Sequence, residues 1–177
     1  HVAGTVAAST NNSIGVAGVA GGVRIMPLRV LGKSGIGTSY DIMQSLRFAA
    51  GLSNDSGSVP AQTADIINLS LGSTSFSQTE QDLYNQLEGL GIIVIAAAGN
   101  SNTSAPDYPA SYDNVVSVSA TNISNQRAYY SNFGGSIDVA APGGALNTDT
   151  NGDGFPDGVL STIADDPSSF TYSFFEG

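Results

Sequence analysis

A strand–helix–strand pattern in residues 64–97 restricts the possible folds of this chain more than any other feature. Ala64–Leu71 and Ile92–Ala97 are short apolar runs, each of the length of a buried strand. The segment between them has the periodicity of a helix. Two parallel strands of one sheet need a crossover connection, usually a helix, so this order predicts a parallel sheet covered by helices.

The connecting segment carries the local signals of a helix. Ser77 and Glu80 form an S-x-x-E capping pattern at its start, and Gly91 suits the left-handed residue that ends a helix. Three leucines are predicted to form its buried face: Leu83, Leu87 and Leu90.

Further elements extend the same order along the chain. We predict helices at residues 1–8 and Thr38–Leu52, and strands at Arg24–Leu31 and Val115–Ser119. Pro27 weakens the strand at 24–31, because proline cannot donate a ladder hydrogen bond. The predicted fold class is α/β, a mostly parallel sheet with helices on both faces.

Composition excludes several functions. The chain has 177 residues, with 5 Lys and Arg against 15 Asp and Glu, so its net charge is −10. Binding to nucleic acid or to an anionic membrane requires basic surface, and we expect neither partner. No apolar run is long enough to cross a bilayer. The chain has no cysteine, which excludes disulfides, thiolate metal sites and a thiol nucleophile.

Active sites of parallel sheets lie in the loops beyond the carboxyl ends of the strands, here after Leu71 and Ala97. The sequence AAAGN, residues 96–100, ends the second run. An Asn after Gly is usually a turn residue, but a carboxamide N–H fixed at a strand end also suits the stabilisation of an oxyanion. Both interpretations remain open from the local sequence.

A phosphate-binding loop is a weaker candidate. The sequence LGKS at residues 31–34 resembles the end of such a loop. The motif needs a glycine five positions before Gly32, where Pro27 stands, so we interpret LGKS as a surface turn. A nucleotide-binding α/β domain is disfavoured for the same reason.

The loop DTNGDGFPDG, residues 149–158, contains the D-x-[DN]-x-[DN]-G start of a calcium loop. An EF-hand has a glutamate at position 12, where Leu160 stands here. The alternative is an acidic turn without metal, although carboxylates this close repel unless a cation neutralises them. The predicted oxygen ligands are Asp149, Asn151, Asp153, the carbonyl of Phe155, and Asp157.

Eight short motifs occur in a fixed order: HVAGTVAA, NNSIGVAGVA, INLSLG, VIAAAGN, YPASY, VVSVSA, NQRAYYSNFG and VAAPG. Together they closely resemble the catalytic domain of subtilisin-like serine proteases, the subtilase family. The resemblance covers nearly the whole chain, with residues 144–160 as the main departure. It implies that residues 1–177 are part of a catalytic domain with a calcium-loop insertion at about 144–160.

The resemblance places the catalytic triad outside the chain. The family's histidine block reads H-G-T-H-V-A-G-T, and its first histidine is the base, so His1 corresponds to the second, non-catalytic histidine. The serine block begins with the glycine matched by Gly177, which places the nucleophile two residues beyond it. The triad aspartate corresponds to a position upstream of His1. We therefore expect residues 1–177 alone to be inactive.

The resemblance also assigns residues within the chain. Asn100 corresponds to the oxyanion-hole asparagine, and Phe133 to the region that shapes the primed side. Substrate-binding positions on one wall are Ser70, Leu71 and Gly72, and on the opposite wall Ala97, Ala98 and Gly99. Because these residues are small, we expect an apolar side chain in the pocket for the residue before the cut.

The loop TNNSIGV, residues 10–16, resembles the family's high-affinity calcium loop. Asn12 would supply a side-chain oxygen, and the carbonyls of Ile14 and Val16 would supply others. One extra residue between Ala8 and Asn11 leaves the ligand at Ser9 or Thr10 open.

The resemblance implies a secreted, calcium-stabilised endopeptidase that acts as a monomer on protein or peptide substrates. A calcium-binding pseudoenzyme with the same fold is the competing interpretation.

Overall fold

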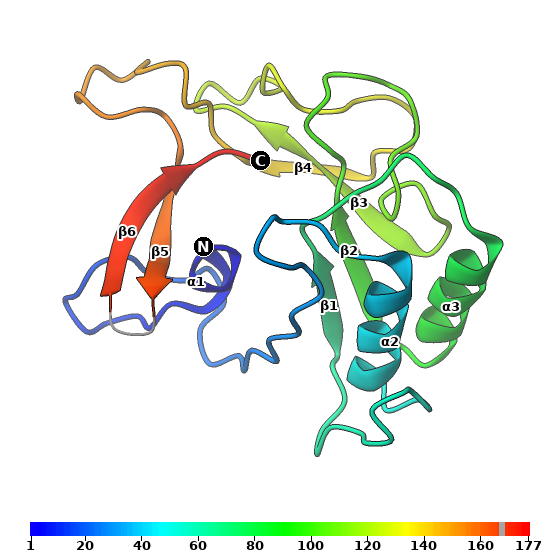
Figure 1. The fold of residues 1–177 in the computed structure, drawn as a ribbon. Helices are drawn as coiled ribbons and strands as arrows, with labels where there is room; N and C mark the ends of the chain where they lie inside the picture. The colour runs from blue at the N-terminus through cyan, green and yellow to red at the C-terminus, as the bar shows by residue number, and fades with distance from the viewer. Residues whose placement is uncertain (167–168) are drawn as a thin grey trace. The chain divides into compact units, whose positions relative to one another are not determined.

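A computed structural model describes residues 1–166 and 169–177, and these residues divide into two units. The first unit contains His1–Ile25, Ala98–Ala105 and Val118–Gly177. The second contains Met26–Ala97 and Pro106–Ser117. Each unit has its own set of helices and strands (Figure 1).

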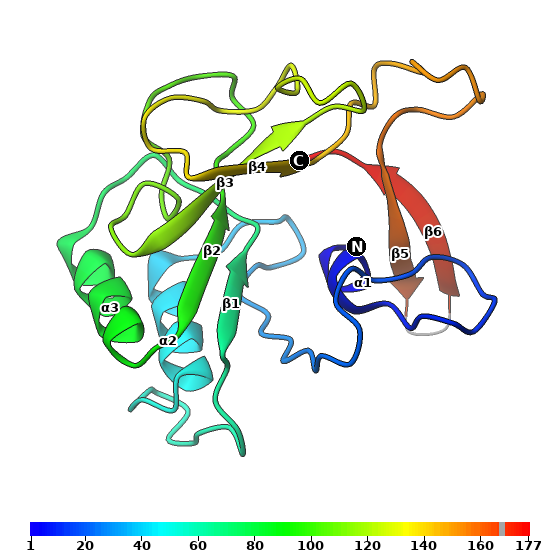
Figure 2. The same ribbon diagram turned by 180° about the vertical axis from the view of Figure 1, so that it is seen from behind.

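The second unit contains the predicted strand–helix–strand pattern. Strand β1 (Ile66–Leu69) pairs in parallel with β2 (Ile93–Ala97). Helices α2 (Ser39–Ala49) and α3 (Gln78–Gly89) cover one face of this pair (Figures 1 and 2). The core between helices and strands includes Leu46, Ala49, Ile67, Leu69, Leu83, Tyr84, Leu87, Val94 and Ala96.

The ends of both helices follow from their sequences. Thr38 caps α2 by accepting a hydrogen bond from the Asp41 amide, and Ser77 caps α3 by accepting one from the Glu80 amide. On α3 the predicted apolar face is correct for Leu83 and Leu87 but wrong for Leu90, which is 53% exposed. Leu90 lies at the C-cap, where the helix ends and the periodicity no longer applies.

The predicted strand at Arg24–Leu31 is not formed. Its apolar side chains are substantially exposed, with Ile25 at 46% and Leu28 at 38%. Pro27 lacks the N–H that a ladder needs, and an apolar run becomes a strand only where a neighbouring strand pairs with it.

Strand β3 (Val115–Thr121) begins in the second unit and ends in the first. In the first unit it pairs in parallel with β4 (Val139–Pro142), with Val118 opposite Val139. The strand order along the sheet is β1-β2-β3-β4. The predicted α/β class with a mostly parallel sheet is therefore confirmed.

The first unit also contains an antiparallel hairpin that the sequence analysis did not predict. Its strands are β5 (Val159–Asp166) and β6 (Ser169–Phe175). Helix α1 (Val2–Ala7), predicted at residues 1–8, packs against β5 (Figure 2). A Cβ built on Gly4 would overlap Thr162 and Ser161, so this contact requires glycine. No helix among the described residues is long and apolar enough to span a membrane.

Candidate functional site

The carboxyl ends of β1 and β2 lie at one edge of the sheet in the second unit. Leu69 is opposite Ala96 in the parallel register, so Ser70 and Ala97 follow at the same edge. Ser70 is exposed, and its hydroxyl accepts a hydrogen bond of 3.0 Å from the Asn68 carboxamide. The structure thus places the predicted wall residues Ser70 and Ala97 at one edge of the sheet.

Beyond Ser70 the chain continues into a short antiparallel contact. Ser73 and Tyr108 exchange two backbone hydrogen bonds of 2.7 Å. This contact sets the carboxyl group of Asp107 directly against Gly72, where a built Cβ would overlap Oδ1 of Asp107. Asp107 was not predicted as a site residue, because its neighbour Gly72 is distant in sequence.

Asn100 lies in the first unit, on the loop that starts at Ala98. The Ala98 amide donates to the Val118 carbonyl at 2.9 Å, and Gly99 has a φ of 102° that strongly favours glycine. Asn100 itself is exposed. Its Nδ2 lies 3.5 Å from the position of a Cβ built on Gly177, so the amide donor and the Gly177 backbone are neighbours.

A buried asparagine, Asn132, holds this loop in place. Its Nδ2 donates to the Ala98 carbonyl at 2.8 Å, and its Oδ1 accepts from the amides of Ser101 at 2.9 Å and Thr103 at 3.3 Å. Its backbone N–H donates to the Gly99 carbonyl at 2.9 Å. Asn132 is only 3% exposed, so these bonds fix the backbone on both sides of Asn100.

Arg127 also contacts this loop. Its Nη1 donates to the Ser131 carbonyl at 2.6 Å and to the Asn102 side chain at 2.8 Å. Its guanidinium lies 4.5 Å from the ring centroid of Phe133. Phe133 is 40% exposed, and its amide donates to the Thr103 carbonyl. Arg127 and Asn132 were not predicted as site residues, because their contacts with residues 98–103 are distant in sequence.

His1 makes structural contacts in the first unit. Its ring stacks on Phe175 with centroids 4.6 Å apart, and Nε2 lies 2.9 Å from the Val159 carbonyl oxygen. Its carbonyl accepts a hydrogen bond from the Ser161 hydroxyl at 2.9 Å. These contacts tie the start of α1 to the hairpin.

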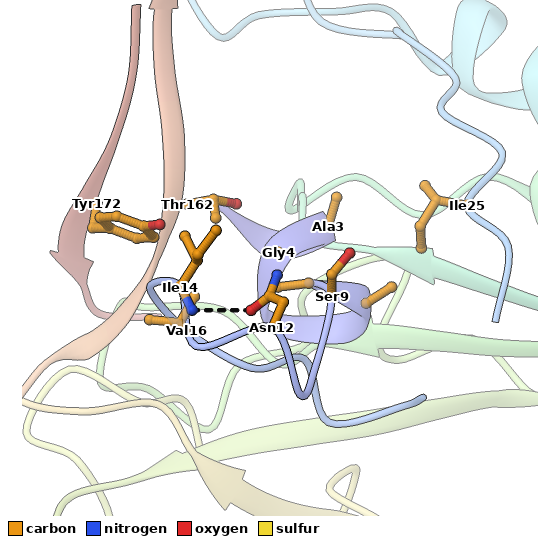
Figure 3. A pocket seen from close by; sticks show the side chains of 11 residues that line it. Ala3, Gly4, Ser9, Asn12, Ile14, Val16, Ile25, Thr162 and Tyr172 are labelled. Atoms are coloured by element: carbon orange, nitrogen blue, oxygen red, sulfur yellow. Dashed lines mark hydrogen bonds between the residues drawn. The ribbon is translucent and has the colours of Figure 1, made fainter. Parts of the chain in front are cut away.

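The loop at residues 10–16 lines a cavity of about 410 Å³ in the first unit (Figure 3). The predicted ligands Asn12, Ile14 and Val16 all lie on this cavity, together with Ser9. Asn12 Oδ1 accepts a hydrogen bond of 3.1 Å from the Ile14 amide. The oxygens that these residues offer are neutral.

The second predicted calcium loop turns around Asp149. One oxygen of this carboxylate accepts from the amides of Gly152 and Asp153, and the other accepts from the Gly154 amide at 3.0 Å. Asp153 Oδ1 accepts from the Phe155 amide at 2.9 Å. The carboxylate of Asp149 therefore closes the turn through its bonds with the following backbone amides.

Asp157 anchors the other end of this loop. Its Oδ2 accepts hydrogen bonds from the Thr150 amide at 2.7 Å and the Thr148 hydroxyl at 2.9 Å. Hydrogen bonding by Thr150, followed by that of Thr148, lowers the pKa of Asp157. Its Oδ1 is buried and has no hydrogen-bond partner among the described residues.

Within residues 1–166 and 169–177, no three His, Cys, Asp or Glu side chains are close enough together to hold a metal ion. The carboxylates of Asp149, Asp153 and Asp157 are thus not gathered around one point. They bond instead to neighbouring backbone amides, as described above. Calcium at this loop remains a prediction.

Comparison with known proteins gives one consistent result. The profile of the subtilase family matches residues 1–177. An extracellular protease of Xanthomonas campestris pv. campestris is 41% identical over all of this chain and 29% of its own length. Subtilisin Savinase of Lederbergia lenta is 42% identical over 81% of this chain and 49% of its own length.

A solved structure gives the same result in three dimensions. The structure described as proteases from Pseudoalteromonas arctica is similar with a TM-score of 0.90 and 43% sequence identity. The match covers all of this chain and 52% of the other. The chain therefore spans between about a quarter and about half the length of the proteins it matches.

Proposed function

Because the chain belongs to the subtilase family, we propose that the whole protein is a serine endopeptidase that cleaves peptide bonds through an acyl-enzyme. In this chemistry a serine attacks the scissile carbonyl, a histidine takes and returns the proton, and an aspartate orients the imidazole. By resemblance these three side chains lie outside residues 1–177. The parts supplied by this chain are the oxyanion donor, the substrate walls and the scaffold that holds them.

The position of Asn100 carries this proposal. Its exposed carboxamide lies beside the Gly177 backbone, and the resemblance places the nucleophile two residues beyond Gly177. An N–H donor beside the attacked carbonyl stabilises the negative charge that forms on its oxygen. Such a donor is effective only when its geometry is fixed in advance, and the bonds of Asn132 fix the surrounding backbone.

The strand ends would bind the substrate. Ser70–Gly72 continues β1 and has exposed residues at positions 70 and 72, which leaves backbone groups available to an extended peptide. Ala97, Ala98 and Gly99 have little or no side chain, so they leave room for the side chain of the residue before the cut. We therefore keep both predicted walls as substrate-binding positions.

We also propose that the protein binds structural calcium at two loops. Asn12 with the carbonyls of Ile14 and Val16 would contribute to one site, and Ser9 on the same cavity is the candidate for the open position. These oxygens suit a hard cation but provide only part of the six to eight ligands that calcium takes.

The second calcium site would be the loop at residues 149–157. Its ligands would be the side chains of Asp149, Asn151, Asp153 and Asp157 and the Phe155 carbonyl. The buried, unpartnered Oδ1 of Asp157 supports this assignment, because a cation would satisfy an oxygen that no described residue satisfies. Calcium would supply charge neutralisation here and no catalytic step.

We also propose that the protein is secreted and acts as a monomer on proteins or peptides. Calcium sites with millimolar to micromolar affinity are filled outside cells, and one of the relatives is an extracellular protease. The charge of −10 disfavours nucleic acid and anionic membranes as partners.

The test uses the full-length protein and a chromogenic peptide. We expect turnover that a serine-reactive inhibitor abolishes, and none from residues 1–177 alone. Inhibitor-sensitive turnover by residues 1–177 would contradict the assignment of the triad to flanking sequence. A full-length protein that unfolds cooperatively but turns over no peptide would support the pseudoenzyme instead.

A further inference from the structure

Asp107 is a titratable side chain that the proposed mechanism does not use, although it stands at a substrate-binding wall. It lies in the second unit, next to the two-bond contact between Ser73 and Tyr108. A Cβ on Gly72 would overlap its Oδ1 and lie 3.2 Å from its Cγ. The space beside the predicted wall residue Gly72 is therefore filled by a carboxyl group.

Hydrogen bonds hold the backbone of Asp107 in place beside Gly72. Its amide donates to the Ser111 hydroxyl at 3.2 Å, and its carbonyl accepts from the Ser111 amide at 2.9 Å. The backbone bonds between Ser73 and Tyr108 join the two segments that carry Gly72 and Asp107. These bonds hold the Asp107 backbone beside Gly72, which brings the carboxyl group to this predicted wall residue.

The carboxyl group is partly desolvated, and the protein compensates for this only in part. Oδ1 is buried, and no described residue forms a hydrogen bond or an ion pair with it. Burial raises the pKa of Asp107, and a backbone hydrogen bond from Ser73 only partly opposes this rise. A partly buried carboxylate with no cation near it is unfavourable in the free protein, and a cation brought by a ligand removes that penalty.

We propose that Asp107 is a specificity residue that binds the lysine or arginine side chain preceding the scissile bond. The proposal rests on the proposed function, because that function makes Gly72 part of the wall around this side chain. Serine proteases that cut after basic residues use a carboxylate in this pocket. An ammonium or guanidinium group would form charge-assisted hydrogen bonds with Asp107.

This inference revises the expectation of an apolar side chain in the pocket. That expectation came from the small residues of the two walls, which define the space available and not its charge. The net charge of −10 also favours basic substrates, since it attracts cationic peptides.

The test compares chromogenic peptides that differ only in the residue before the cut: arginine, lysine or leucine. For the full-length protein we expect a higher kcat/KM with arginine and lysine than with leucine. In Asp107→Asn the ratio of kcat/KM for arginine over leucine should fall roughly 10- to 100-fold, the usual effect of losing a hydrogen bond between charged groups. Hydrolysis of the leucine peptide reports that the variant is folded.

Glu88→Gln is the matched control. Glu88 is exposed on α3 in the same unit, so this change removes the same charge away from the wall. The ratio should stay within about twofold of the parent, because a distant exposed charge is screened. Benzamidine, an aromatic cation, should inhibit the parent and Glu88→Gln more strongly than Asp107→Asn.

Two outcomes would overturn the inference while leaving the protease intact. One is a parent that prefers leucine to arginine and lysine. The other is an Asp107→Asn variant with an unchanged ratio of arginine to leucine. A full-length protein that cleaves none of the three peptides would instead contradict the proposed function.

Discussion

At the residue scale, Asn132 holds the backbone on both sides of Asn100. The two side chains have the same chemistry but opposite surroundings, since Asn132 is 3% exposed and Asn100 is exposed. The carboxamide of Asn132 donates to the Ala98 carbonyl and accepts from the amides of Ser101 and Thr103. Because Asn132 satisfies those backbone groups, none of them needs the Asn100 carboxamide as a partner.

Replacing Asn100 tests its role as the oxyanion donor. In the full-length protein, Asn100→Leu should lower kcat by roughly 10²- to 10³-fold, a magnitude taken from removal of this donor in a subtilisin. KM should change little, because the bond strengthens only as the charge develops. Asn100→Asp keeps the shape but exchanges the donor for an acceptor, so its loss should be at least as large. Turnover unchanged in both variants would remove Asn100 from the oxyanion hole.

Asp107 should make substrate selection depend on pH. Burial raises its pKa above the ordinary value of 3.8, so its carboxylate takes up a proton at a higher pH than a solvated aspartate does. The arginine-to-leucine ratio of kcat/KM should therefore fall as pH falls through this raised pKa. The ratio cancels titration of the catalytic groups, which affects both substrates equally. The same ratio should be independent of pH in Asp107→Asn, and a matching decline there would assign the effect to another group.

At the element scale, α3 begins with a capping pattern that a tyrosine completes. The Glu80 amide donates to the Ser77 hydroxyl, as the S-x-x-E pattern predicts. The reciprocal bond is indirect: the Tyr112 hydroxyl accepts from the Ser77 amide at 2.8 Å and donates to Glu80 Oε2 at 3.0 Å. Burial, and then the neighbouring Glu80, raise the pKa of Tyr112 to about 12, so the hydroxyl remains a donor at neutral pH.

Removing this hydroxyl should destabilise the protein. Tyr112→Phe leaves the Ser77 amide and the Glu80 carboxylate without their partner, so we expect a loss of about 1–2 kcal/mol in the free energy of unfolding. Equilibrium unfolding in urea of the inhibitor-blocked full-length protein measures it. Tyr108→Phe is the control, because its ring lies 4.6 Å from that of Tyr112 and its hydroxyl forms no hydrogen bond among the described residues. Equal losses in both variants would show that the relay contributes nothing.

Elements defined by local periodicity could be predicted, whereas elements that depend on a partner could not. Both long helices and the strands β1, β2 and β3 appear where the sequence places them, because their spacing and caps are local. The run at 24–31 has the composition of a strand but forms none, since no pairing partner is encoded in the run itself. The hairpin β5–β6 was missed for the converse reason, because its polar and aromatic residues form no apolar run.

The distinction between local patterns and contacts with distant partners also applies to the candidate functional site. Asn100 was found because it ends an apolar run, a feature that sequence shows directly. Asn132 contacts Ser101 across 31 positions, and Asp107 meets Gly72 across a similar separation, so neither contact leaves a local pattern. Asp107 directly precedes the family motif YPASY, but that motif by itself does not indicate the contact with Gly72.

At the scale of the whole molecule, the excess of acidic residues means that a bound cation would stabilise the folded state. The first unit contains both predicted calcium loops and has seven Asp or Glu residues against two Arg. Like charges in one folded unit repel, and this repulsion destabilises the compact state. A divalent cation that bound either loop only in the folded chain would lower this repulsion, and its binding free energy would add to stability.

Removal of calcium should therefore lower the melting temperature of the inhibitor-blocked full-length protein. A site held at about 100 times its Kd contributes about 2.7 kcal/mol, which corresponds to a shift of roughly 5–10 °C for a domain of this size. The measurement is thermal unfolding with calcium, with EDTA, and with EDTA followed by excess calcium, which should restore the original temperature.

Asp149→Asn combined with Asp153→Asn should remove part of the EDTA effect, and Asn12→Ala should remove another part. Asp82→Asn, on the exposed surface of α3, should leave the effect unchanged. A melting temperature that does not respond to EDTA would contradict both sites, and a response that survives the Asp149 and Asp153 changes in full would contradict the site at residues 149–157 alone.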